Sequence, residues 1–134
     1  MTVNRVLAWA GSAVALAAVA AGLYIAGAPS EARLMRLDEQ RVRDLQTLAR
    51  VIDAYRVAEG ELPPSLAAAV QARRVQRLPV DPETGEPYRY EVVTPDAYRL
   101  CAEFARPSLK LPGMSFWEHD AGARCFDIPV NAAK

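Results

Sequence analysis

The sequence is poor in the side chains on which most enzyme and metal sites depend. It has one histidine, His119, and two cysteines, Cys101 and Cys125, among 134 residues. A single histidine excludes a zinc site built on two imidazoles, and the two cysteines are too far apart for a Cys-x-x-Cys motif. No glycine-rich loop of the phosphate-binding type is present. We therefore expect neither a cofactor nor an enzymatic activity.

Two candidate sites that include His119 remain to be considered, a hydrolytic triad and a metal site. Ser115, His119 and Asp120 contain the residue types of a hydrolytic triad, but neighbours on one loop rarely converge on a single atom, and no nucleophile-elbow pattern surrounds a serine. His119 could also join Cys101 and Cys125 around a metal, without the usual close cysteine spacing. A hydrolase is accordingly the third and last of the functions that we consider.

Charge is absent from one long stretch near the N-terminus. Residues 6–30 contain no Asp, Glu, Lys, Arg or His, and Val6 to Ala28 is an apolar run of 23 residues. A helix rises about 1.5 Å per residue, so roughly 20 residues cross a hydrocarbon layer of about 30 Å. Trp9 and Tyr24 fall near the two ends, where amphipathic rings prefer the membrane interface. We predict a transmembrane anchor over residues 1–29, with residues 6–28 in the lipid bilayer.

A cleaved signal peptide is the alternative reading of this run. Ala26-Gly27-Ala28 imitates a small-x-small cleavage site, whereas Pro29 disfavours cleavage there and the apolar run is long for a signal. We favour a retained anchor. Both readings export the rest of the chain.

The direction of the anchor is contested by two signals. Only Arg5 precedes the span, whereas four arginines follow it closely, and this distribution favours a cytoplasmic C-terminus. Cys101 and Cys125 form an even pair 24 positions apart, which suggests a disulfide in an oxidising compartment, the alternative being two separate buried thiols. We give the cysteines more weight and predict a single-pass inner-membrane protein with its C-terminal domain in the periplasm. The arginines are Arg33, Arg36, Arg41 and Arg43.

Residues 30–134 have the length of one domain. They carry 15 basic and 16 acidic residues, and this balance excludes a general affinity for nucleic acid. A long amphipathic helix is predicted from Glu31 to Gly60, with an apolar face that includes Leu45, Leu48 and Ile52. Gly60 should end the helix with a positive φ. The remaining helix surface is assigned to charged residues: Arg41, Arg43, Asp44, Arg50, Asp53 and Arg56.

The second half of the domain has strand periodicity. After a short helix opened by Pro63-Pro64, strands are predicted at Tyr88–Val93, at Tyr98–Phe104 and from Cys125 onward, the first two forming an antiparallel hairpin. Tyr88 and Tyr90 are expected on opposite faces of the first strand, with one ring on the long helix. The predicted fold is α+β: a transmembrane helix continues into an amphipathic helix that packs on a small antiparallel sheet.

The segments LQTLARVIDAYRVAEGELPPSL and LPVDPETGEPYRYEV carry a family resemblance. This part of the chain, roughly residues 38–104, resembles type IV pilins and the pseudopilins of type II secretion systems, the major pseudopilin above all. The resemblance implies a pilin-like fold and a structural or protein-interaction role in a secretion or envelope assembly. The N-terminal segment lacks the glycine cleavage site and the early glutamate of prepilins, which implies that the chain is neither processed nor polymerised as they are.

The resemblance also raises a calcium site, because a loop of the major pseudopilin binds this ion. The corresponding acids here are Asp81, Glu83, Glu86 and Asp96. Calcium takes six to eight oxygens, and a plain turn with solvated acids is the preferred reading of this proline-bounded segment. A secreted or anchored binding module, calcium-dependent in one version, is the alternative to the structural role.

Phe116 and Trp117 form an aromatic pair outside the predicted strands. If exposed, they would be a partner-binding site, either for another protein or for self-association; if packed under their loop, they are core. We favour packing, because a small sheet needs a cover.

Overall fold

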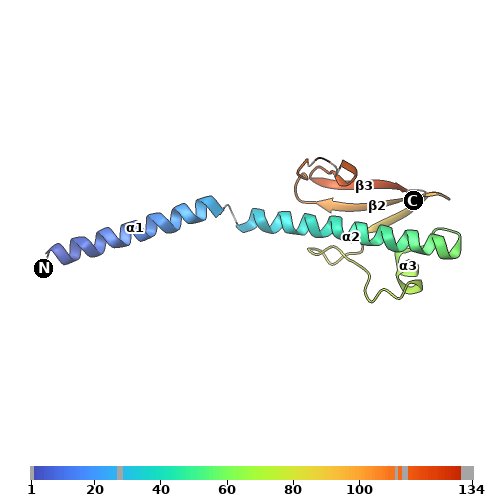
Figure 1. The fold of residues 1–134 in the computed structure, drawn as a ribbon, viewed down its shortest axis with the longest axis horizontal. Coiled ribbons are helices and arrows are strands. Elements are labelled where there is room, and N and C mark those ends of the chain that lie inside the picture. The colour runs from blue at the N-terminus through green and yellow to red at the C-terminus, as the bar shows by residue number, and fades with distance from the viewer. Residues whose placement is uncertain (1, 27–28, 111, 113–114, 131–134) are drawn as a thin grey trace. The chain divides into compact units, whose positions relative to one another are not determined.

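The structure is a computed structural model that describes residues 2–26, 29–110, 112 and 115–130. Its compact units are Met1–Leu34 and Met35–Lys134. The first is helical, and the second combines helices with a three-stranded antiparallel sheet, so the predicted α+β class is confirmed (Figure 1).

Helix α1, Thr2–Ala26, is long and apolar enough to cross a membrane. Its aliphatic side chains are exposed, for example Leu7 at 64% and Leu16 at 71%. An aliphatic helix with this much uncovered surface is stable when an apolar medium surrounds it.

Helix α2, Pro29–Glu59, is the predicted amphipathic helix and begins two residues earlier than expected. Leu45, Leu48 and Ile52 are almost completely buried, which confirms the predicted apolar face. Gly60 ends the helix with a φ of 81°, as predicted, and its N–H donates to the carbonyl of Arg56 at 2.9 Å. A residue with a β-carbon is disfavoured at this φ, so glycine fixes the position of the helix end.

Helix α3, Leu66–Ala72, is capped by Ser65, whose Oγ accepts the N–H of Ala68 at 3.1 Å. The serine, and not the proline pair, therefore opens this helix, because an N-cap must supply a side-chain acceptor. At the other end Arg73 donates from its side chain to the carbonyl of Ala54 in α2.

The sheet has the order β1-β2-β3, with β1 at Arg89–Thr94, β2 at Ala97–Phe104 and β3 at Gly122–Pro129. The hairpin of β1 and β2 is confirmed. Strand β3 begins three residues before Cys125, because its ladder with β2 continues to the pair Phe104–Gly122. A short 3-10 helix, Ser115–Trp117, lies in the connection between β2 and β3.

Strand β2 alternates between two environments. Tyr98, Leu100, Ala102 and Phe104 are buried in a core that they share with α2, as their spacing predicts. Arg99 and Glu103 point to the opposite face. The hydroxyl of Tyr98 donates to the carbonyl of Ala49 at 3.3 Å. One face of the sheet therefore covers the apolar side of α2 (Figure 1), whereas Glu103 on the other face is exposed.

The prediction that Tyr88, just before β1, and Tyr90, within it, lie on opposite faces was wrong. Residues two apart on a strand share a face, so Tyr88 and Tyr90 cannot be divided between the two sides. Tyr88 is 6% exposed and donates to Asp44 Oδ2 at 2.8 Å, and Tyr90 packs on the core and donates to the carbonyl of Pro63 at 2.8 Å. Both rings thus help to attach the sheet to the helical layer.

Candidate functional site

Arg41 is the centre of the largest buried polar cluster in the domain, and its side chain is only 3% exposed. Nε and Nη2 donate to the two carboxylate oxygens of Asp81 at 2.6 and 3.1 Å. Nη1 donates to Asp38 Oδ1 at 2.8 Å, and Nη2 also donates to Glu83 Oε2 at 2.8 Å. We call these four residues the Arg41 cluster. It joins α2 to the loop before β1 through a fork of guanidinium hydrogen bonds.

Asp38 extends the Arg41 cluster to a third segment. Its two carboxylate oxygens accept the backbone N–H groups of Ala105 and Arg106 at 2.9 and 2.8 Å. These two residues follow the last residue of β2, so the carboxylate fixes the direction in which the chain leaves the sheet. A buried carboxylate is stable here because a cation and two backbone donors share its charge.

The charges of the Arg41 cluster stabilise one another. Burial by itself would raise the pKa of Asp81, but hydrogen bonds from Arg41 and from the backbone N–H groups of Thr84 and Glu83 outweigh burial and lower it to about 2. The hydrogen bonds to Asp81 are also the main reason why the pKa of Arg41 is raised. Both groups therefore stay ionised at neutral pH.

Two expectations are corrected by this geometry. Arg41 was assigned to the solvated side of α2, and Asp81 was read as a solvated turn residue; both are buried. The reason is their pairing across 40 positions of sequence, which allows each to leave water without losing a partner for its charge.

The four candidate calcium ligands do not converge. The carboxylates of Asp81 and Glu83 accept hydrogen bonds from Arg41, and Asp96 pairs with Arg56 at 2.8 Å at another place on α2. Glu86 is exposed. Within the described residues, no three His, Cys, Asp or Glu side chains form a group that could hold a metal ion.

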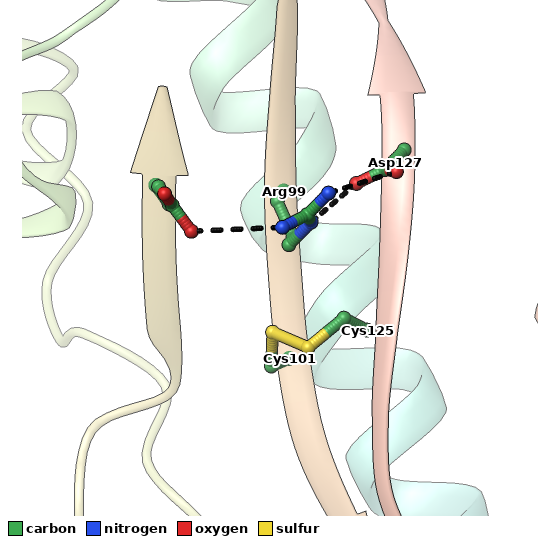
Figure 2. Close-up of a disulfide and its surroundings, with 5 residues drawn as sticks. Arg99, Cys101, Cys125 and Asp127 are labelled. Atoms are coloured by element: carbon green, nitrogen blue, oxygen red, sulfur yellow. Dashed lines mark hydrogen bonds and ion pairs between the residues drawn. A yellow bond between two sulfur atoms is a disulfide. The ribbon is translucent and has the colours of Figure 1, made fainter. Parts of the chain in front are cut away.

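The outer face of the sheet carries the two cysteines. Cys101 of β2 and Cys125 of β3 are direct register partners, and their sulfurs lie 2.00 Å apart, the length of a disulfide bond (Figure 2). Cys125 is exposed, whereas Cys101 is 8% exposed. A disulfide between paired positions of neighbouring strands ties β3 to the hairpin.

Arg99 lies one row along the same face. Nε and Nη2 donate to the two carboxylate oxygens of Asp127 at 2.6 and 3.1 Å, and Nη1 is 3.8 Å from Glu91 Oε2 (Figure 2). We call Glu91, Arg99 and Asp127 the Arg99 row. The hydrogen bonds from Arg99 lower the pKa of Asp127, and the row lies in water, since both acids are more than 60% exposed.

His119 has structural contacts rather than the geometry of a triad. Its ring stacks on Phe104, with ring centroids 3.6 Å apart, and Nδ1 lies 3.0 Å from the carbonyl of Trp117. The backbone N–H of His119 donates to Ser108 Oγ at 3.0 Å. Asp120 is exposed. His119 therefore holds the connection between β2 and β3 against the sheet.

The two partner-binding candidates have different environments. Trp117 is partly buried against the core, and its ring centroid is 4.9 Å from that of Phe126. Phe116 is 50% exposed and meets Trp117 edge-on at 5.1 Å. Trp117 also lines a groove of about 270 Å³ between α2 and residues 106–109 and 117–119. Trp117 is therefore packed on the core, whereas the adjacent Phe116 is half exposed.

Comparisons with known proteins give no relative for this chain: no family model, curated protein or solved structure matches it. The long apolar N-terminal helix and the small antiparallel sheet are compatible with a pilin-like fold, and the assignment stops at this architecture.

Proposed function

We propose that this chain is a membrane-anchored structural or protein-interaction protein whose pseudopilin-like domain lies in the periplasm as part of a secretion or envelope assembly. Helix α1 would hold it in the inner membrane. The observation that carries the proposal is the joining of an uncovered apolar helix of 25 residues to a domain of mixed helix and sheet.

The contacts of the buried ionisable side chains in the domain support a structural role. The buried ionisable side chains Asp38, Arg41 and Asp81 hydrogen-bond one another and the backbone, and His119 stacks on a core ring. Their contacts hold α2, the loop before β1 and the connection between β2 and β3 together.

The uncovered face of the sheet is the surface that we assign to a protein partner. It carries the disulfide and the Arg99 row, and a hollow of about 300 Å³ lies beside Arg89 and Glu91. Its charged and polar groups are of the kind found at the rim of protein interfaces.

Photo-crosslinking of the full chain in its native membranes tests this assignment. A crosslinking side chain at Glu103, exposed on the outer face of the central strand, should give a discrete product with a second copy or with another envelope protein. The matched control is Val57, which is 81% exposed near the end of α2. Equal products from both positions, or none from Glu103, would remove the outer face as the interaction surface.

The calcium-dependent binding module is tested by melting the detergent-solubilised chain with and without calcium. Since Arg41 already neutralises Asp81 and Glu83, we expect an unchanged midpoint. A rise that saturates with calcium concentration, and that disappears in Asp96→Asn, would favour the calcium module over a purely structural role.

A further inference from the structure

The groove between α2 and residues 106–109 and 117–119 has apolar side chains on both walls. Met35 and Val42 of α2 form one wall, and Leu109 and Trp117 form the other. Its volume of about 270 Å³ is comparable with that of a small ligand pocket. We call it the α2–loop groove.

Three of the seven large apolar side chains that are exposed in the described residues from Met35 onward lie at or beside this groove. Leu109 is 69% exposed and Met35 41%, and both line it, while Phe116, 50% exposed, adjoins the lining residue Trp117. The other large hydrophobic side chains exposed in the described residues from Met35 onward are all valines, Val57, Val80, Val92 and Val93. Leucine, methionine and phenylalanine in contact with water favour burial against an apolar partner.

Chain length restricts what that partner is. Met35 follows Ala28, the last residue of the apolar run, by seven positions, so even a fully extended chain keeps it within about 25 Å of the end of the run. If α1 spans the bilayer, the groove is held at the membrane surface. The lipid headgroups and upper acyl chains are then its most concentrated apolar neighbour.

The charges at the groove select between two ways of binding lipid. The charged side chains that line the groove are of both signs: Asp38, Glu39, Arg43, Arg106 and Glu118. Arg43 also pairs with Glu39, with 3.7 Å between Nη1 and Oε2. Charges of both signs do not select anionic headgroups, whereas Leu109, Phe116 and the half-buried Trp117 suit the apolar side of the interface.

From these observations we propose that the α2–loop groove binds the acyl-chain region of a phospholipid in the same bilayer that α1 crosses, with Leu109 and Phe116 inserted beside it. The proposal rests on the membrane anchoring proposed above. It gives the anchored domain a second attachment, which would fix its orientation at the membrane surface.

The two tryptophans make the test direct, because Trp9 lies in α1 and Trp117 lines the groove. The full chain carrying Trp9→Phe is placed in phosphatidylcholine vesicles, with or without bromine on the upper part of the acyl chains. We expect bromine to quench Trp117 fluorescence, and high salt to leave this quenching unchanged. The double variant Leu109→Ser/Phe116→Ser should lose the quenching, and the control Val57→Ser should keep it.

The chain carrying Trp117→Phe separates this proposal from the anchoring, since its remaining tryptophan reports on α1. Quenching of Trp9 together with unquenched Trp117 would overturn lipid binding by the groove and leave the anchor in place. Absence of quenching at both positions would overturn the anchoring as well. A blue shift of the Trp117 emission on vesicle insertion, without bromine quenching, would mean that protein and not lipid covers the groove. This result would contradict the proposal.

Discussion

Arg41 and Arg99 both bind carboxylates, Arg41 in the protein interior and Arg99 at the surface. Each guanidinium binds both oxygens of one aspartate. Arg41 binds two further carboxylates and Arg99 approaches one, but the Arg41 side chain is 3% exposed and that of Arg99 is 37% exposed. In water an ion pair replaces solvation of nearly equal strength, so it adds little to stability. In the interior each charge depends on its partner, because water is no longer available.

The difference also concerns what each arginine connects. The Arg41 cluster joins α2, the loop before β1 and the end of β2. The Arg99 row lies within a sheet whose strands are already held by backbone hydrogen bonds and, on the same face, by the disulfide. Loss of the first should therefore loosen the packing of helix on sheet, and loss of the second should not.

The largest effect is expected from Arg41→Met. Removal of the cation leaves the carboxylates of Asp38 and Asp81 buried without a counter-charge, which typically costs about 3–5 kcal/mol. Urea unfolding of the detergent-solubilised chain, followed by circular dichroism, measures this loss. Arg43→Met is the matched control, because Arg43 is 58% exposed on the same helix, and it should leave the midpoint near that of the wild type. Similar losses in the two variants would show that the burial of Arg41 has no energetic consequence.

The next effect is expected from the double variant Cys101→Ser/Cys125→Ser. The disulfide closes a loop across 24 positions, and loops of this length contribute about 3 kcal/mol in the chain-entropy model. The same unfolding experiment should place the variant well below the oxidised wild type and close to the wild type under reductant. A reductant effect that persists in the serine variant would have another origin.

Acid should distinguish the two arginines next. The pKa of Asp81 is lowered to about 2 in the folded protein, while an unfolded aspartate titrates near 3.9. The unfolded state thus binds the extra proton first as pH falls, so this contribution is complete above about pH 5 and is lost toward pH 2. Stability measured across this range should fall more steeply in the wild type than in Arg41→Met. Arg99→Met should stay closer to the wild-type slope, because the lowered pKa that it removes belongs to the exposed Asp127. Parallel curves for all three proteins would contradict the assignment.

The smallest effect is expected from Arg99→Met. The acids of the Arg99 row are exposed and return to water when the arginine is removed, so the unfolding midpoint should stay close to that of the wild type. Moderate salt should reduce even this difference, because exposed charges are screened. A loss as large as that of Arg41→Met would mean that the outer face of the sheet is covered in the native assembly.

Sequence periodicity predicted the elements but not the polar cluster that joins them. The alternation of Tyr98, Leu100, Ala102 and Phe104 identified β2 and its inward face, and Gly60 identified the end of α2, since both signals are local. The Arg41 cluster depends on Asp81, 40 positions away, and no local pattern reports that distance. A signal was nonetheless present: Asp38 and Arg41 continue the three-and-four spacing of Leu45, Leu48 and Ile52, so they occupy the buried stripe.

The remaining misreadings have equally specific causes. Tyr88 and Tyr90 were divided between two faces against the two-residue period of a strand. Trp117 packs closer to Phe126 of β3 than Phe116 does, with ring centroids 4.9 and 6.1 Å apart, and these contacts come from another element. The calcium candidates were grouped by a resemblance, and their hydrogen bonds with arginines could not be read from it.

The most direct test of a retained anchor and an exported, bridged domain is the intact mass of the protein extracted from membranes after its free thiols are blocked with N-ethylmaleimide. The predicted species retains the apolar run, residues 6–28, and has no maleimide adduct, because Cys101 and Cys125 are bonded to each other. A species beginning at or beyond Pro29 would contradict the anchor. A full species with two adducts would contradict export and restore the cytoplasmic topology that the arginines after the span favour.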